Sequence, residues 1–188
     1  MGVRALHRRA VEATGKLVDG LTDAQLDLPT PCSKWTVREV VGHMVDNHTR
    51  LIAALGGTAP ETADDVRVGY RRATDATQAA FADGAALSAT YELAGKSRTG
   101  GEVLGIMFGD VLVHGWDLGR SIGVEVRFEE ELAEQMVQTL EAFPNTPDVW
   151  GPDAAFAGRL PVAEGSSAHD RLLAITGRQA DWAPAGTN

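Results

Sequence analysis

The sequence predicts an all-α fold, a four-helix bundle with short extra helices. Apolar residues recur at helical spacing over several long stretches, and Gly or Pro residues follow these stretches. Strand-like alternation is confined to 87–93, which is too little to build a core sheet. A chain of 188 residues can bury one sizeable core. We therefore expect a single domain over 1–188, with 144–188 forming a Pro-rich C-terminal excursion and a short helix packed on the bundle.

The first two long helices have clear end signals. The first is predicted over 3–19 and is followed by a glycine. A capping box then opens a one-turn helix at 22–25, which two prolines end. The second long helix is predicted over 37–55, because Thr36 and Glu39 form a capping box in front of a wide apolar face.

The middle of the chain is less regular. Residues 63–82 are compatible with a helix but only weakly apolar, with a cap offered from Thr62 and a stop at Gly84. Residues 87–93 contain β-leaning side chains, so we expect a short strand or an extended crossover there. Residues 95–101 are interpreted as a polar turn.

The central helix is predicted over 101–121, the last long helix over 128–143 and a short helix over 167–176. Four glycines in the central helix each cost roughly 0.5–1 kcal/mol relative to alanine. We interpret them as points where another helix approaches closely. They are Gly105, Gly109, Gly115 and Gly119.

Charge and composition exclude several classes of protein. The net charge of −9 and pI near 5.0 would repel phosphate backbones, so we expect no nucleic-acid partner. The basic cluster of Arg4, His7, Arg8 and Arg9 is interpreted as a solvated helix face. The sequence contains neither a membrane-spanning run nor a signal-peptide stretch, so we expect a cytoplasmic protein without a membrane partner. The single cysteine, Cys32, excludes a multi-cysteine zinc site and is interpreted as a small buried residue.

Three ionisable residues share one face of the mostly apolar central helix. His114 and Asp117 lie roughly 40° and −20° around the helix from Asp110. Burying them costs free energy unless they bind each other, backbone groups, water or a metal. Asp110 and His114, one turn apart, suit a divalent ion, although such pairs also form surface hydrogen bonds. We interpret Asp117 as a supporting residue that orients His114 or pairs with an arginine such as Arg50 or Arg120.

A third candidate ligand lies on the second long helix. His43 is at the edge of its apolar face. Two histidines and one carboxylate leave one coordination position open for water or substrate, as in catalytic zinc sites. Asn47 and Arg50 follow at successive turns of the same helix and are candidate substrate-binding residues.

Two segments of the chain carry a family resemblance. They are LPTPCSKWTVREVVGHMV at 28–45 and GDVLVHGWDLGRSIG at 109–123, and the C-terminal HDRLLAITGR adds to them. The chain resembles the mycothiol-dependent maleylpyruvate isomerase-like proteins of the DinB-like (YfiT-like) superfamily of metal-binding four-helix bundles. The resemblance covers essentially the whole chain and is closest to the short, single-domain members. It implies a DinB-like bundle.

The resemblance also implies a ligand set. In the superfamily the metal is held by one histidine on the second bundle helix and by a His or Glu plus a His four residues later on another helix. The matching residues here are His43, Asp110 and His114, and zinc is the expected metal. Asp110 stands where the isomerase branch has Glu, so one methylene of reach must be recovered by a backbone shift or through a water.

The function that the resemblance implies is that of a metal- and mycothiol-dependent thiol transferase or isomerase acting on a small electrophile. A coordinating thiol ionises, and the thiolate is the nucleophile. The alternatives are a non-catalytic DinB-like metal-binding or stress-associated protein and a metal-dependent hydrolase, whose open position holds water. The isomerase has a further C-terminal domain that this chain is too short to hold, so its substrate is not carried over. A homodimer through the glycine-containing or weakly apolar helices is also expected.

Overall fold

The computed structural model describes residues 1–93, 95–143, 146, 147, 149–151 and 154–184. Over these residues the protein is mostly helical, which confirms the all-α prediction. The long helices are α1 (Val3–Gly20), α2 (Val37–Ala54), α3 (Val66–Ala80) and α5 (Gly100–Ser121). The shorter ones are the 3₁₀ helix η1 (Asp23–Asp27), α4 (Ala85–Ser88), α6 (Glu130–Glu141) and α7 (Ala168–Ile175).

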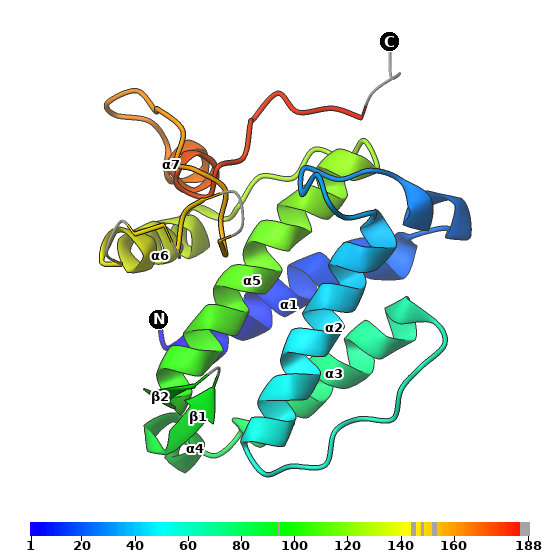
Figure 1. The fold of residues 1–188 in the computed structure, drawn as a ribbon, viewed down its shortest axis with the longest axis vertical. Helices are drawn as coiled ribbons and strands as arrows, with labels where there is room; N and C mark the ends of the chain where they lie inside the picture. Colours follow the sequence, from blue (N-terminus) through cyan, green and yellow to red (C-terminus); the bar gives the residue numbers. More distant parts are fainter. Residues whose placement is uncertain (94, 144–145, 148, 152–153, 185–188) are drawn as a thin grey trace.

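Helix α5 lies at the centre of the bundle. It packs along α1 and α2, and α2 packs on α3 (Figure 1). The largest cluster of buried apolar side chains joins α1, α2 and α5 to α6 and α7. Because neighbours surround α5 on most sides, polar side chains on it must find partners inside the protein. Among the described residues, no helix combines the length and apolar character needed to cross a membrane.

Two of the four glycines of α5, Gly109 and Gly115, allow close helix approach, as the sequence predicted; the prediction is wrong for Gly105, where a Cβ would make ordinary contact, and for Gly119, where it would meet Val126 in the segment after α5. A Cβ on Gly115 would collide with the hydroxyl oxygen of Thr14 on α1. That hydroxyl donates to the carbonyl of Val111 at 3.1 Å. A Cβ on Gly109 would likewise meet the Met136 side chain on α6 at 2.7 Å. These glycines therefore set how closely α1 and α6 approach the central helix.

The helix starts follow their capping signals, with one correction. At α2 the hydroxyl of Thr36 accepts from the backbone N–H of Glu39 at 3.4 Å, and the Glu39 carboxylate accepts from the Thr36 N–H at 2.7 Å. Helix α3 starts later than predicted, at Val66, because Asp65 rather than Thr62 is its N-cap. The Asp65 carboxylate accepts from the N–H of Arg67 at 2.9 Å.

A β-hairpin occupies the stretch before α5. The strand expected within 87–93 is present as β1 (Thr90–Leu93), but it pairs antiparallel with β2 (Lys96–Thr99). The prediction of a polar turn over 95–101 is therefore wrong. Strand β2 has the polar sequence KSRT and no apolar face, so ladder hydrogen bonds rather than side-chain burial hold it in place. Gly95, between the strands, has the positive φ of +72° that favours glycine.

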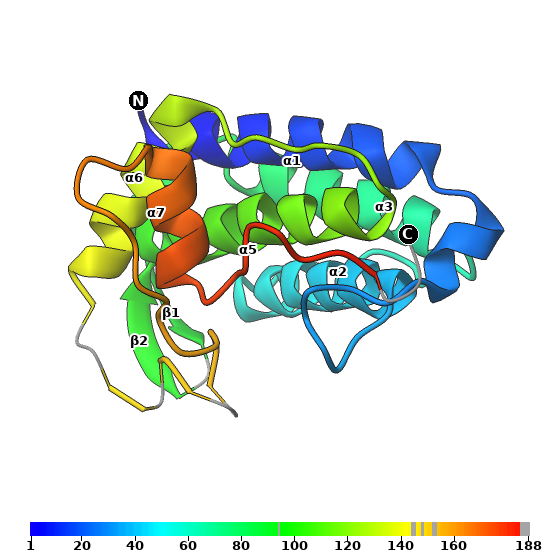
Figure 2. The ribbon, with the colours of Figure 1, turned by 90° about the horizontal axis from the view of Figure 1, so that it is seen from above.

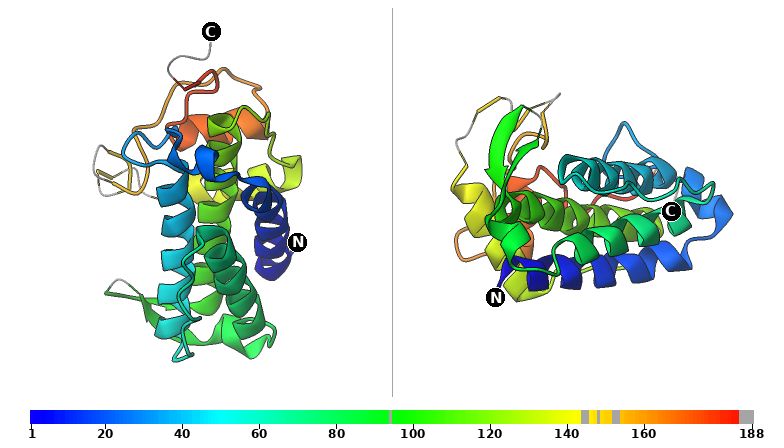
Figure 3. Two further views of the ribbon diagram at one scale, coloured as in Figure 1. Left: turned by 90° about the vertical axis from the view of Figure 1, so that its right-hand side faces the viewer. Right: turned by 90° about the horizontal axis from the view of Figure 1, so that it is seen from below.

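The described part of the C-terminal segment is packed. Helices α6 and α7 contact each other and lie along one side of α5 (Figure 2), where Met136 of α6 approaches Gly109. The indole N–H of Trp150 donates to the carbonyl of Ile175 at 2.7 Å, and its ring stacks near Phe156. After α7 the chain runs back across α5 towards the loop before α2 (Figure 2). The hairpin lies at the other end of the bundle from the loop before α2 (Figure 3).

Candidate metal centre

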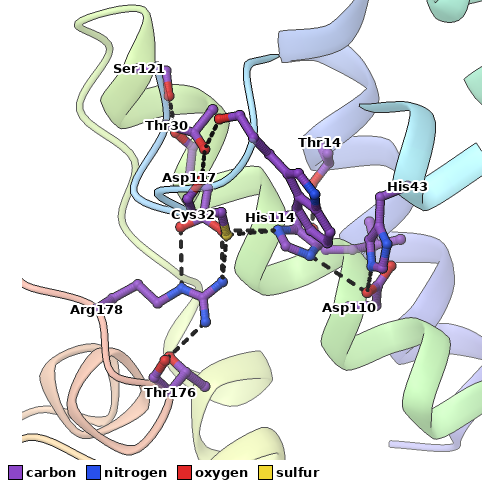
Figure 4. A network of polar contacts seen from close by, with 12 residues as sticks. Thr14, Thr30, Cys32, His43, Asp110, His114, Asp117, Ser121, Thr176 and Arg178 are labelled. Carbon is purple, nitrogen blue, oxygen red and sulfur yellow. Dashed lines mark hydrogen bonds and ion pairs between the residues drawn. The ribbon is translucent and has the colours of Figure 1, made fainter. Parts of the chain in front are cut away.

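Helices α2 and α5 bring His43, Asp110 and His114 together (Figure 4). The Nε2 atom of His43 lies 3.0 Å from Oδ1 of Asp110, and Nε2 of His114 lies 3.6 Å from the same oxygen. One ligand atom from each residue lies within 4.8 Å of the other two. Ligand atoms of a tetrahedral zinc site lie about 3.3 Å apart when each bond is about 2.0 Å. The cluster therefore has dimensions that suit one ion.

The short side chain of Asp110 bridges the two helices. Its Oδ1 contacts His43 on α2 directly, while its Oδ2 is buried with no hydrogen-bond partner among the described residues. Burial alone would raise the pKa of Asp110, but the hydrogen bond with His43 and the nearby His114 hold it below its ordinary value. Asp110 is thus a carboxylate at neutral pH. A buried carboxylate oxygen without a partner costs about 1–3 kcal/mol or more, which a bound cation would offset.

The hydrogen bonds around His114 leave a lone pair facing Asp110. Nδ1 of His114 lies 2.9 Å from Oδ2 of Asp117. Burial opposes ionisation of Asp117, but Arg178 and His114 hold its pKa below the ordinary value, so the carboxylate accepts and Nδ1–H donates. In the neutral imidazole Nε2 is then an acceptor. Two acceptors that face each other, Nε2 and Oδ1 of Asp110, are stabilised by a cation or proton between them.

Of the two candidate substrate-binding residues, the structure brings one to this cluster. Nδ2 of Asn47 lies 2.9 Å from Nε2 of His43 and 3.3 Å from Oδ1 of Asp110. The side chain of Arg50 is 70% exposed, and its guanidinium lies 3.8 Å from Asp46 on the same helix. Asn47 therefore touches two candidate ligands, whereas Arg50 is directed to solvent.

Asp117 is held from its other side by Arg178, which the sequence reasoning missed. Arg178 donates from Nε to Oδ1 of Asp117 at 3.2 Å and from Nη2 to Oδ2 at 2.8 Å (Figure 4). The expectation that Arg50 or Arg120 would pair with Asp117 is wrong, because Nε of Arg120 donates to the carbonyl of Trp182 at 2.9 Å instead. The available signal was the position of Arg178 as the last residue of HDRLLAITGR.

Cys32 belongs to the same network as a hydrogen-bonding thiol. Its Sγ donates to Oδ2 of Asp117 at 3.3 Å and accepts from Nη2 of Arg178 at 3.2 Å. Burial, reinforced by the charge of Asp117, raises the pKa of the thiol to about 12. The protonated thiol is a weak nucleophile. Cys32 and His114 could also share a metal with Asp117, but the guanidinium of Arg178 already supplies the positive charge at that position.

Trp35 covers the two imidazoles. Its ring centroid lies 4.5 Å from that of His43 and 5.9 Å from that of His114. The half-buried ring packs against the core and also forms one wall of the cluster. Trp116 on α5 is buried in the core.

Comparison with known proteins agrees with this architecture. A family model described as the mycothiol maleylpyruvate isomerase N-terminal domain matches residues 7–119. The chain belongs to this family. The match to the mycothiol maleylpyruvate isomerase N-terminal domain includes His43, Asp110, His114 and Asp117, whereas Arg178 lies beyond it.

The chain is similar to two proteins from Mycobacterium tuberculosis. They are the uncharacterized protein MT0763 of strain CDC 1551 / Oshkosh and the uncharacterized protein Rv0738 of strain ATCC 25618 / H37Rv. Each is 30% identical over 174 residues, which cover 92% of this chain and 95% of the relative. No solved structure matches significantly.

Proposed function

We propose that the protein is a metal-dependent thiol transferase or isomerase that uses mycothiol and acts on a small electrophile. His43, Asp110 and His114 would hold the ion, with zinc as the first candidate. The observation that carries the proposal is the buried Oδ2 of Asp110, which lacks a hydrogen-bond partner among the described residues beside two imidazole nitrogens. Three protein ligands leave one position open, which is the arrangement of catalytic rather than structural zinc sites.

A bound divalent ion lowers the pKa of a coordinating thiol, so that the sulfur is held as the nucleophilic thiolate. Each side chain around the cluster has its own part in this proposal. Asp117 keeps the proton of His114 on Nδ1 and so leaves Nε2 free to bind the ion. The ring of Trp35 excludes water from one side of the imidazoles. The amide of Asn47 can turn from His43 to donate to an oxygen of the substrate.

The family supports thiol chemistry over hydrolysis, because mycothiol stands in its name. The lack of a reactive protein thiol is consistent with this choice. Cys32 is protonated and engaged with Asp117 and Arg178, so the nucleophile would have to come from outside the chain. A small thiol at the open position meets this requirement.

A first experiment tests whether the cluster holds a metal. Protein purified without an affinity tag should contain about one divalent ion per chain by elemental analysis. The isosteric variant Asp110→Asn removes the ligand charge, so its metal content should fall below about 0.2 ions per chain. Asp46→Asn is the matched control, since Asp46 is an exposed carboxylate on α2. Equal metal content in the wild type and both variants would reject the site.

A second experiment separates thiol chemistry from hydrolysis. Mycothiol is titrated into metal-loaded protein by calorimetry in two buffers with different ionisation enthalpies. Binding as thiolate should release about one proton per thiol at neutral pH. Metal-loaded protein that does not bind mycothiol at about millimolar concentration would reject the thiol mechanism and favour the hydrolase. A thiol that binds but reacts with no electrophile would favour the non-catalytic alternative.

A further inference from the structure

A second polar cluster lies in the bundle outside the metal centre. His7 on α1 and His48 on α2 are 1% and 0% exposed, and their Nε2 atoms are 3.1 Å apart. The sequence had predicted His7 on a solvated face of α1. That prediction is wrong because His7 is on the inward side of α1, which packs on α5 and α3, while Arg4 and Arg8 of the same basic cluster stay exposed.

The hydrogen bonds of this pair determine where its protons are. Nδ1 of His48 lies 2.7 Å from the carbonyl oxygen of Met44, which only accepts, so Nδ1 of His48 carries a proton. Burial lowers the pKa of His48, and burial together with His48 lowers the pKa of His7 to about 3. Both rings are therefore neutral. Nε2 of His48 then accepts from Nε2–H of His7, which leaves Nδ1 as the acceptor nitrogen of the His7 ring.

His7 also lines a cavity of about 520 Å³, between the start of α1, the end of α3 and the segment from α4 to α5. Apolar walls come from Val3, Leu87 and Leu104. This volume lies within the range of small-molecule sites, which are mostly apolar with a few fixed polar groups. The buried His7 is such a group, because His48 holds its ring in one tautomer.

The charges at the cavity are of one sign. The chain has 26 acidic and 17 basic residues, yet the cavity is lined by Arg4 and Arg8 and by no carboxylate among the described residues. The guanidinium of Arg4 donates to the carbonyl of Ala82 at 2.7 Å and so forms a fixed wall. Arg8 is exposed and forms an ion pair with Glu12 one turn on, with Nε 3.8 Å from the carboxylate; an exposed pair of this kind contributes only about 0.3–0.5 kcal/mol, so a bound anion can replace it. Arg8 is therefore available to an anion.

We propose that this cavity binds a small hydroxy acid with an apolar side chain. The carboxylate pairs with Arg8, the hydroxyl donates to Nδ1 of His7, and the apolar part packs on Leu87 and Leu104. This site is independent of the metal centre and of the function proposed for it.

The test uses the full chain with ¹⁵N-labelled histidine and NMR detection of the ring nitrogens. The probes are 3-phenyllactate and 2-hydroxyoctanoate. Either should shift the Nδ1 resonance of His7 and leave that of His169 unchanged, because His169 already accepts from the N–H of Phe128 at 3.2 Å. The analogues 3-phenylpropionate, without the hydroxyl, and 3-phenyllactamide, without the charge, should bind at least about threefold more weakly than 3-phenyllactate.

Two exposed arginines provide matched variants. Arg8→Gln should weaken 3-phenyllactate binding about threefold to fivefold. Arg50→Gln should not, because Arg50 is on α2 and does not line the cavity. The proposal is overturned if neither hydroxy acid shifts the His7 resonance at about 20 mM. It is also overturned if 3-phenylpropionate binds as tightly as 3-phenyllactate, or if the two arginine variants behave alike.

Discussion

The guanidinium of Arg178 donates to both carboxylate oxygens of Asp117, at 3.2 and 2.8 Å, across 61 residues of chain. Asp117 in turn contacts Nδ1 of His114. The C-terminal segment after α7 is thus connected to the candidate metal centre through one buried carboxylate. That segment lies outside the residues that the family model matches.

Replacing Arg178 should weaken metal binding although Arg178 is not itself a ligand. Arg178→Met leaves Asp117 buried without its cation and loosens the orientation of His114, which should lower zinc affinity about 10- to 100-fold. Competition with a chromogenic chelator measures this. Arg178→Lys keeps the positive charge but cannot contact both carboxylate oxygens of Asp117 in the same way. Its zinc affinity should therefore lie between those of Arg178→Met and the wild type. Arg120→Met is the control, since Arg120 contacts Trp182 of the same tail. Wild-type affinity in Arg178→Met would contradict the proposed role.

Lengthening Asp110 should not improve the site. Its Oδ1 already lies 3.0 Å from Nε2 of His43, so Asp110→Glu adds a methylene to a filled gap between α5 and α2. We expect a loss of about 1–3 kcal/mol in the free energy of unfolding of the metal-free protein. Zinc affinity should stay equal or fall. Urea unfolding and chelator competition give the two values, and tighter zinc binding in Asp110→Glu would show that the aspartate is too short.

Two glycines of α5 should respond to alanine in opposite directions. A Cβ on Gly115 would collide with Thr14, so Gly115→Ala should destabilise the protein by about 1–3 kcal/mol. At Gly105 the nearest atom to such a Cβ is a methyl of Val3 at 3.9 Å. Gly105→Ala should therefore stabilise the helix by about 0.5–1 kcal/mol. Thermal and urea unfolding measure the stability of both variants. If Gly105→Ala also destabilised the protein, the conclusion that α1 approaches α5 closely at Gly115 but not at Gly105 would be refuted.

The buried pair of His7 and His48 should make folding sensitive to mild acid. Both folded-state pKa values lie below the ordinary 6.5, that of His7 at about 3, so the unfolded chain takes up protons first as pH falls. Stability should therefore decrease from about pH 6.5 towards 3, by at most about 1.4 kcal/mol per pH unit for each imidazole.

The double variant His7→Leu/His48→Leu is the comparison for this prediction. Removing both partners of a buried hydrogen bond is close to neutral when the shapes are similar. Urea unfolding between pH 7 and 5, above the ordinary carboxylate range, should show a smaller slope in the variant than in the wild type. Parallel slopes would mean that the pair does not titrate on unfolding.

Local signals in the sequence predicted the helices well and singled out the candidate ligands. The capping box of Thr36 and Glu39 starts α2 as expected, because it involves backbone groups only three residues apart. The spacing of Asp110 and His114 placed them on one face of α5, because helical geometry alone decides that. His43 was grouped with them through its motif, and the structure brings all three together.

Non-local contacts account for what the sequence reasoning missed. Strand β2 is polar and carries no periodic apolar pattern, so only its pairing with β1 reveals it. His7 stands among arginines, and its burial depends on how α1 is turned against α5 and α3. Arg178 is separated from Cys32 by 146 residues, and nothing in its local sequence states which carboxylate it will meet.

The sequence by itself determined the all-α class, the positions of the long helices and the identity of the candidate ligands. The helices and the shared face of Asp110 and His114 follow from backbone hydrogen bonding and from the 3.6-residue period, which act over a few residues. His43 was joined to them through the family resemblance. The tertiary structure decided whether Asp110 reaches His43, which arginine holds Asp117 and which nitrogen of His7 is the acceptor. Those outcomes depend on the distance between α2 and α5, on the path of the chain after α7 and on the rotation of α1, all of which are set by packing of residues far apart in the chain.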